Sequence, residues 1–178
     1  SGGERCTIGI LGTGSNCCIF DGSKIEKNAM NLGFMIGDEG SGYRMGRDVL
    51  RYYFYDLMNA KDLSLFTSEY SLSRDAVIRK VYHESETPNT YIASFCEFLA
   101  KCSLELRRAI ALYNLEQFFE YQITKLPVSS SMPLHFSGSI SWFFKDELRE
   151  LSTKYGFKIG NIIQNPIDSL TYSKLNSL

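Results

Sequence analysis

The sequence predicts an α/β fold built on a mixed five-stranded sheet, in the order β-β-β-α, a helical insertion, and then β-α-β with a C-terminal helix. Three observations predict it. Short apolar segments separated by tight turns open the chain, a long helix-forming stretch fills its middle, and a strand–helix–strand unit lies near its end. Antiparallel strands continued by parallel ones give a mixed sheet with helices on its faces.

The composition is that of a protein with a substantial core and little net charge. Of its 178 residues, 44% are hydrophobic and 13% aromatic, which suits one large domain or two small ones. The net charge of −1 gives no reason to expect nucleic acid or an anionic membrane as a partner. No apolar run approaches the length of a membrane span. Because the chain starts at Ser1 and enters a strand almost at once, we expect it to be cut from something longer.

The cysteines and histidines indicate neither a disulfide framework nor a metal site. The five cysteines are odd in number and fit no zinc spacing: Cys6, Cys17, Cys18, Cys96 and Cys102. We interpret them as buried free thiols of a cytoplasmic protein. The two histidines, His83 and His135, lie far apart in the sequence, so no histidine-based metal site is expected.

Three antiparallel strands are expected at the start of the chain. Apolar residues favour strands over Cys6–Leu11, Cys17–Phe20 and Ile25–Met30. Asp21-Gly22, between the second and the third, is a strong hairpin signal. A first glycine-rich loop therefore falls between strands one and two.

Helices are expected over most of the middle of the chain. Ser41 is a suitable N-cap for a helix that runs to about Asn59, and Ser73 for a short helix over 74–83. Residues 60–90 are otherwise polar and mixed, whereas 90–126 is strongly helical, with breaks that indicate two helices. We expect residues of about 60–130 to form an all-helical insertion.

The last third of the chain predicts a parallel unit. Strands are expected over 133–136 and 157–163, and a helix over 140–155 should link them by a right-handed crossover. Gly156 is suited to end that helix. Pro166 predicts the start of a last helix, near 167–175.

The first glycine-rich loop, Gly12–Asn16, predicts a binding site. It follows a buried strand and carries no bulky side chain, so a ligand can approach its backbone. If Gly12 and Gly14 adopt positive φ, their N–H groups converge, and short polar side chains add donors at the same place. This suits a phosphate or a row of sugar hydroxyls. The alternative interpretation is a plain tight turn.

A second glycine-rich loop, Gly37–Gly42, strengthens the interpretation of the first as a binding site. Its carboxylates, Asp38 and Glu39, lie just before the helix that Ser41 caps. They either complement the helix dipole or present one carboxylate to the ligand loop, and the residues alone leave both hypotheses open.

These segments resemble a known family. Ile10–Cys17 (ILGTGSNC), Leu32–Gly42 (LGFMIGDEGSG) and Ser137–Ile140 (SGSI) are similar, in order and spacing, to the BadF/BadG-type ATPases, which include the N-acetylglucosamine kinases. The resemblance covers nearly the whole chain. It implies a ribonuclease H-like (actin-like ATPase) lobe, one of two that close around ATP with Mg²⁺ and a sugar.

The resemblance also implies which residues bind ATP and which bind the sugar. ATP and its phosphates are expected at Gly12, Thr13, Gly14, Gly138 and Ser139. The sugar is expected at Ser15, Asn16, Asn31, Leu32, Gly33 and Asp38. Two positions depart from the family, which often has Trp in place of Leu32 and Gly in place of Ser137. No residue is assigned to a metal.

The family's first phosphate loop and its general-base Asp find no match in this sequence. The resemblance places both upstream, so residues 1–178 are expected to form the C-terminal lobe alone. The expected partners are an amino sugar, above all N-acetylglucosamine, the N-terminal lobe, and a second copy in a homodimer. Without the base, we expect the isolated chain to be inactive.

Two other functions remain open. Members of the same family act as ATPase activators of acyl-CoA reductases or dehydratases, with a shared iron–sulfur cluster; Cys17 and Cys18 do not match that arrangement. The third hypothesis is a non-catalytic module that senses a nucleotide or a sugar, but no DNA-binding segment of the kind such regulators carry is evident.

Overall fold

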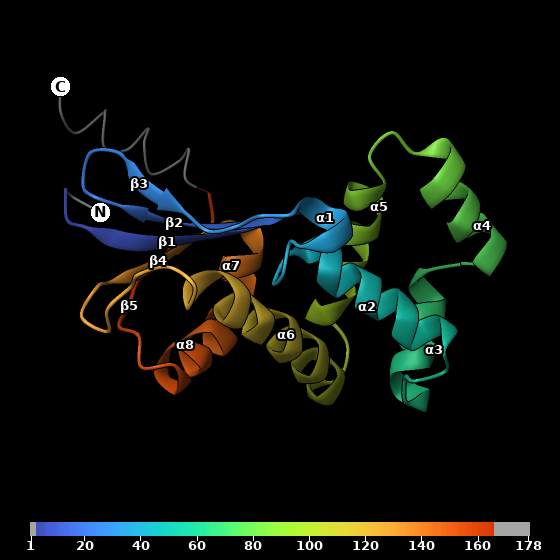
Figure 1. Ribbon diagram of the computed structural model, residues 1–178. Coiled ribbons are helices and arrows are strands. Elements are labelled where there is room, and N and C mark those ends of the chain that lie inside the picture. The colour runs from blue at the N-terminus through green and yellow to red at the C-terminus, as the bar shows by residue number, and fades with distance from the viewer. Residues whose placement is uncertain (1–2, 166–178) are drawn as a thin grey trace, which may run out of the picture.

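A mixed five-stranded sheet forms one half of the molecule (Figure 1). The computed structural model describes residues 3–165. The sheet order is β3-β2-β1-β4-β5, and its strands are β1 (Cys6–Leu11), β2 (Ser15–Phe20), β3 (Ile25–Asn28), β4 (Leu134–Ser137) and β5 (Ile159–Ile163). β2 pairs antiparallel with β1 and β3, whereas β4 pairs parallel with β1 and β5. The predicted mixed sheet is therefore confirmed; the helix predicted over 167–175 lies outside the described residues.

Helices cover the sheet and form the other half of the molecule. They are α1 (Gly33–Ile36), α2 (Gly42–Phe54), α3 (Ala60–Glu69), α4 (Arg74–Arg79), η1 (Lys80–Glu84), α5 (Pro88–Ser94), η2 (Phe95–Ala100), α6 (Leu104–Phe118), η3 (Phe119–Ile123), α7 (Ser139–Phe143) and α8 (Lys145–Lys154). α6 and α8 lie along the sheet, whereas α2 to α5 extend away from it (Figure 1). Over residues 3–165, none of the helices combines the length and the apolar character that crossing a bilayer requires.

Three helix predictions need correction. The helix capped by Ser41 ends at Phe54, not near Asn59, because Asn59 starts α3 instead: its side chain accepts the N–H of Asp62. α3 itself was missed in a stretch interpreted as polar and mixed. The single helix over 140–155 is two helices, α7 and α8, which break at Phe144, where φ is −104° and the ring is fully buried.

The predicted helical stretch 90–126 is more divided than expected. It contains α5, η2, α6 and the π-helical turn η3 rather than two helices. Apolar residues at helical spacing in this stretch predict one buried stripe: Ile92, Phe95, Leu99, Leu106, Ile110 and Tyr113. All of them are buried except Tyr113, which is 57% exposed. The aromatic stretch Phe118–Tyr121 is expected from the sequence to belong to the core. Phe118 and Phe119 are fully buried, whereas Tyr121 is 54% exposed.

The sheet and the helices meet at a close contact between Gly9 and two aromatic rings. A Cβ on Gly9 would lie 2.8 Å from the ring of Phe136 and 3.2 Å from that of Phe118. Phe136 comes from β4 and Phe118 from the end of α6, so β1 has room for them only because residue 9 lacks a side chain. The rings place the end of α6 next to the strand that leads into the first glycine loop.

The predicted hairpin turn is confirmed. The Asp21 carboxylate accepts the backbone N–H groups of Ser23 and Lys24 at 2.8 and 2.9 Å, and Gly22 has φ of +105°. These backbone donors, together with the Ser23 hydroxyl, lower the pKa of Asp21 to about 2. β3 is shorter than predicted, although Ala29 still donates its N–H to the Cys17 carbonyl.

Candidate functional site

The first glycine loop is a tight connection between β1 and β2. Gly12 donates its N–H to the Gly14 carbonyl at 2.9 Å, and Leu11 faces Ser15 across the strands. Neither Gly12 nor Gly14 adopts the positive φ that glycine permits. Within residues 3–165, no hydrogen bond uses the backbone N–H of Thr13 or Gly14, so these two donors are free for a ligand.

The second glycine loop is bonded directly to the first. At the start of α2, Gly42 and Tyr43 donate their N–H groups to the carbonyls of Gly12 and Thr13, at 2.8 and 3.1 Å. Ser41 caps the helix, as predicted, by accepting the N–H of Arg44. Because these N–H groups have partners in the chain, this helix end joins the loops and does not bind an anion itself.

The Asp38 carboxylate lies against the first loop. A Cβ on Gly14 would come within 2.7 Å of Asp38 Oδ2. Asp38 is buried at 7% exposure and has φ of +56°, a left-handed conformation that is uncommon for a residue with a side chain. Of the two hypotheses, the geometry therefore favours the one in which a carboxylate faces the ligand loop.

Ser15 connects several parts of the site. It is 5% exposed, and its hydroxyl accepts the side-chain amide of Gln122 at 3.1 Å. The same amide nitrogen donates to Glu39 Oε2 at 3.1 Å. On the backbone side, the Ser15 carbonyl accepts the Asn31 amide, and Asn31 in turn accepts the N–H of Gly33 at 2.6 Å. Ser15 is thus joined to both segments that are predicted to bind sugar.

Asn16 and Leu32, both predicted to bind the sugar, lie outside the cavity and show no contact that points to a ligand. Asn16 is half-buried, and its side chain accepts the N–H of Cys17 at 2.8 Å. Leu32 is 56% exposed and packs beside Gly37 at the start of the second loop. Neither residue lines the large cavity described next.

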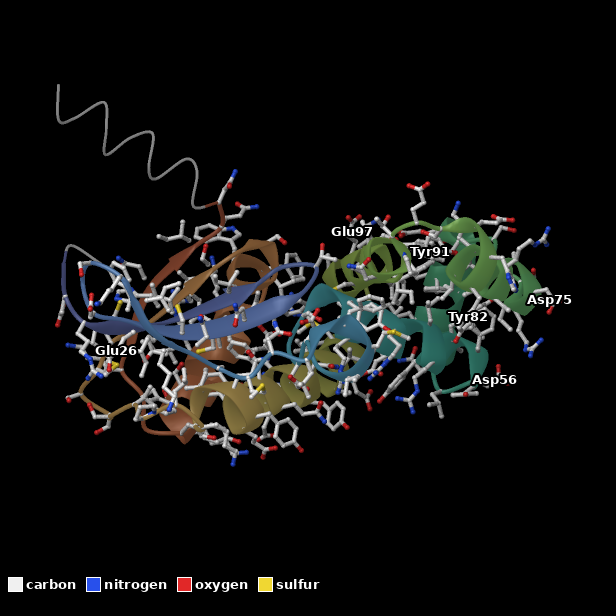
Figure 2. All side chains as sticks on the ribbon, turned by 45° about the horizontal axis from the view of Figure 1, so that its top comes forward. Glu26, Asp56, Asp75, Tyr82, Tyr91 and Glu97 are labelled. Carbon is white, nitrogen blue, oxygen red and sulfur yellow. The ribbon has the colours of Figure 1, made fainter. Side chains whose placement is uncertain are left out.

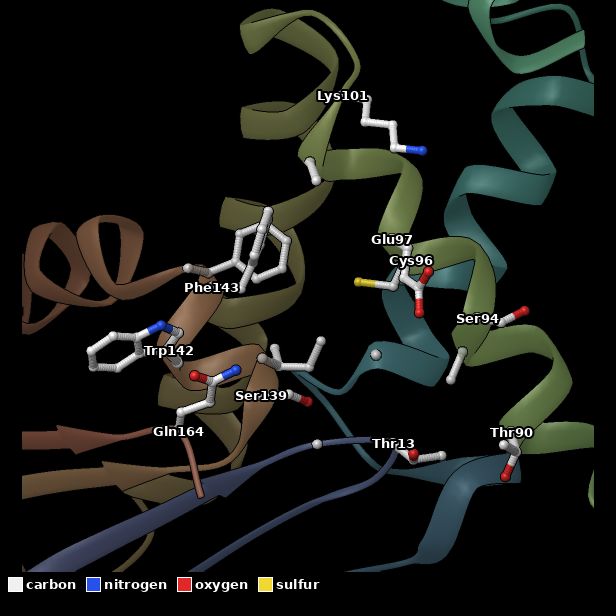
Figure 3. Close-up of a pocket in the computed structure, with 16 residues that line it drawn as sticks. Thr13, Thr90, Ser94, Cys96, Glu97, Lys101, Ser139, Trp142, Phe143 and Gln164 are labelled. Atoms are coloured by element: carbon white, nitrogen blue, oxygen red, sulfur yellow. The ribbon is translucent and has the colours of Figure 1, made fainter. Parts of the chain in front are cut away.

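A cavity of about 550 Å³ lies next to Gly12 and Thr13 of the first loop, and Asp38 is not among the residues that line it (Figure 3). The first loop and α7 form one wall, with Gly12, Thr13, Ser139, Trp142 and Phe143. Helical residues of α5 and η2 form the facing wall, with Thr90, Ser94, Cys96 and Glu97. Two predicted ATP-binding segments that lie more than a hundred residues apart in the sequence therefore meet at one cavity.

Gly138 does not line this cavity but positions the helix that does. Its φ is +113°, and a Cβ there would collide with the Leu11 carbonyl oxygen, so only glycine fits. Its N–H donates to the Ile163 carbonyl at 2.9 Å. Gly138 thus holds the start of α7 close to the end of β1, which brings Ser139 to the cavity.

Cys96 is the one thiol among the residues that line this cavity. Burial raises its pKa to about 12, and the same cause raises that of Cys17 to about 12. Both thiols are free and protonated at neutral pH, so neither is suited to be a nucleophile. Across residues 3–165, no three His, Cys, Asp or Glu residues gather as metal ligands.

Several residues of the site were not predicted from the sequence. Thr90, Ser94 and Glu97 occur in a helical stretch that shows only its apolar spacing in the sequence. Trp142, the single tryptophan, follows the third glycine-bearing segment, and that position is the signal that could have indicated it. Gln122 lies between apolar residues, and nothing in its neighbourhood marks it as polar core.

Comparison with solved structures shows which proteins share this sheet and these helices. The chain is similar to the crystal structure of a candidate N-acetylglucosamine kinase from Porphyromonas gingivalis, with 30% identity and a TM-score of 0.88 over 99% of this chain. The resemblance to N-acetylglucosamine kinase-like proteins is therefore confirmed. No protein-family model matches the chain, and no curated protein matches it significantly.

A second structure supports the fold. A candidate N-acetylglucosamine kinase from Chromobacterium violaceum is 18% identical, with a TM-score of 0.56 over 89% of this chain. This chain spans 62% of the first structure and 56% of the second. The activity of a complete protein of this kind is accordingly a matter of proposal.

Proposed function

We propose that this chain is the C-terminal lobe of an ATP-dependent sugar kinase, of the ribonuclease H-like, actin-like ATPase class, and that its substrate is N-acetylglucosamine. One observation carries the proposal. Gly12 and Thr13 of the first loop line the cavity together with Ser139, whereas the next residue, Gly14, lies against the Asp38 carboxylate, which does not line the cavity. A loop between a nucleotide and an acceptor sugar requires this arrangement, because the transferred phosphoryl group must pass from one to the other.

The nucleotide half of the proposal rests on the cavity. Its volume of about 550 Å³ falls in the usual range for small-molecule sites. Trp142 and Phe143 offer aromatic surface to a base, and Thr13, which lines the cavity, offers its free N–H to phosphate oxygens. The N–H of Gly14, the next residue, is free as well. ATP would bring Mg²⁺ with it, held mainly by phosphate oxygens and water. The ion would neutralise charge on the transferred group.

The sugar half rests on Asp38 and its surroundings. A buried carboxylate is an acceptor for two sugar hydroxyls, and it orients the acceptor with little loss of its own freedom. Asn31 fixes the segment next to it through its two hydrogen bonds. The general base that takes the hydroxyl proton is proposed to lie upstream in the complete protein, so the chain alone should not transfer phosphate.

The test is ADP release by the full-length protein with Mg·ATP, in the presence and absence of N-acetylglucosamine. The proposal predicts release that depends on the sugar, and loss of that release in Asn16→Ala and Asp38→Ala with unchanged thermal unfolding. Release that ignores every sugar offered would contradict it in favour of an ATPase activator. Binding of nucleotide without turnover would contradict it in favour of a sensor.

A further inference from the structure

The side chain of Gln122 is fully buried, yet it lies between the two glycine loops. It belongs to η3, a five-residue π-helical turn that follows α6. Such turns are rare and often occur at functional sites, because they move a side chain off the regular helical position. Here the turn sets the amide between β2 and the second loop.

A single nitrogen of this amide serves both loops. Gln122 Nε2 donates to the Ser15 hydroxyl and to Glu39 Oε2, each at 3.1 Å. The amide oxygen, Oε1, is buried and has no hydrogen-bond partner among the described residues. An uncompensated buried acceptor costs free energy, so a side chain that served only to fill space here would be better apolar.

The hydrogen bond from Gln122 to Glu39 affects the position of Asp38, the preceding residue. Asp38 precedes Glu39 directly and has a strained backbone with φ of +56°. Its side chain has no hydrogen bond of its own among those found in residues 3–165, so its place against Gly14 depends on the backbone that carries it. A strained residue persists only when its surroundings hold it. The Asp38 carbonyl accepts the N–H of Ser41 at 3.1 Å, and the Glu39 side chain adds a second contact through Gln122.

We propose that Gln122 is a positioning residue of the sugar site: by holding Glu39 and Ser15 at one amide nitrogen, it fixes the Asp38 segment against the first loop. The inference rests on the proposed function for its catalytic consequence, but the mechanical claim stands apart from it. Gln122 does not line the nucleotide cavity, so its effect should fall on the sugar and not on ATP.

The experiment is a double-mutant cycle in the full-length protein with Gln122→Met and Glu39→Ala. Methionine keeps the length of the side chain and removes both the hydrogen bonds and the unpaired oxygen. We expect amide hydrogen exchange over residues 31–42 to become about ten-fold faster in each single variant, and the double variant to add little. Glu39→Gln, which keeps an acceptor oxygen, should restore the protection.

The matched control is Gln117→Met. Gln117 lies on α6 of the same helical segment and accepts a hydrogen bond from Arg44 at 2.7 Å, away from Ser15 and Glu39. It should leave exchange over 31–42 unchanged, and its effect should add to that of Glu39→Ala. Unchanged exchange in Gln122→Met, or additive effects of Gln122→Met and Glu39→Ala, would overturn the positioning role, whether or not the protein phosphorylates a sugar.

Kinetics then test the consequence for the site. Where the wild type releases ADP in response to sugar, Gln122→Met should raise KM for the sugar about ten-fold and leave KM for ATP unchanged. Equal changes in both constants would overturn a role specific to the sugar side. If Gln122→Met fails to fold, Glu39→Ala and Glu39→Gln test the same hydrogen bond through its acceptor. Equal KM values for the sugar in these two variants would overturn the positioning role.

Discussion

The sheet end and the helical end of this molecule are stabilised in different ways. At the sheet end, backbone ladders and small residues allow close approach, as at Gly9 and Gly138, and polar side chains join the loops. At the helical end, aromatic rings fill the interior: Phe66 lies 4.6 Å from Tyr53 and 5.0 Å from Phe98, ring centre to ring centre. Figure 2 shows Glu26 at the sheet end and Asp75 at the tip of the helical end.

This difference shows what each end requires of its sequence. Aromatic packing tolerates many arrangements of similar volume, whereas a backbone that approaches another backbone requires glycine at one position. The candidate site lies at the sheet end and at its junction with α5 and η2. We therefore expect changes at the helical end to affect stability most, and changes near the first loop to affect function most.

Phe66→Ala should have the largest effect on stability. The ring is fully buried and contacts Tyr53, Tyr70 and Phe98. Its removal should leave a cavity and lower the free energy of unfolding by about 4 kcal/mol, measured by urea denaturation. A loss below about 1 kcal/mol would show that the helical end is not a packed core.

Gly46→Ala should come next. A Cβ on this residue of α2 would collide with the Ile92 carbonyl oxygen of α5, so the two helices would have to separate. We expect a loss of about 3 kcal/mol in the free energy of unfolding. Gly12→Ala is the control: nothing lies within 4 Å of its Cβ position, and its stability should stay within about 0.5 kcal/mol of the wild type.

Gly14→Ala should affect function more than stability. The new methyl group would meet the Asp38 carboxylate, which is the free end of a side chain and can move away. In the full-length protein we expect kcat/KM for the sugar to fall about ten-fold, with a change in Tm below about 3 °C. An unchanged kcat/KM for the sugar, or an equal change in KM for ATP, would contradict a route through the Asp38 carboxylate.

The smallest effect is expected at the Asp21 turn. Because its pKa is lowered to about 2, the carboxylate stabilises the folded state above its ordinary pKa of about 4, and this contribution is lost as the pH falls towards 2. The difference in Tm between the wild type and Asp21→Ala should be constant from pH 5 to 8 and shrink below pH 4. A difference that persists unchanged at pH 2 would contradict this assignment.

The sheet could be predicted from the sequence because its signals are local. Asp21-Gly22 specifies a turn, and the apolar runs of Cys6–Leu11 and Ile159–Ile163 alternate with turn residues. The helical end could not be divided correctly, because its boundaries depend on tertiary contacts. The break between α7 and α8 falls at Phe144, whose ring is fully buried, and no glycine or proline marks it in the sequence.

The site was predictable only in part. The glycine loops are recognisable as sequence motifs, and the cavity does unite Thr13 with Ser139. The conformation of the first loop was not predictable, since Gly14 is required by the carboxylate of Asp38 and not by its own φ. Gln122 and Glu97 reach the site through the packing of η3 and η2, which a single sequence does not reveal.

The central claim is that the nucleotide binds in the cavity and the sugar binds at Asp38, with the first loop between them. The most direct test compares Asp38→Asn with Ser139→Trp by steady-state kinetics in the full-length protein. Asp38 lies against Gly14, and Ser139 is exposed in the cavity, where an indole would fill space. We predict that Asp38→Asn raises KM for N-acetylglucosamine and not for ATP, and that Ser139→Trp does the reverse. Parallel changes in both constants for both variants would contradict the placement of nucleotide and sugar on opposite sides of the first loop.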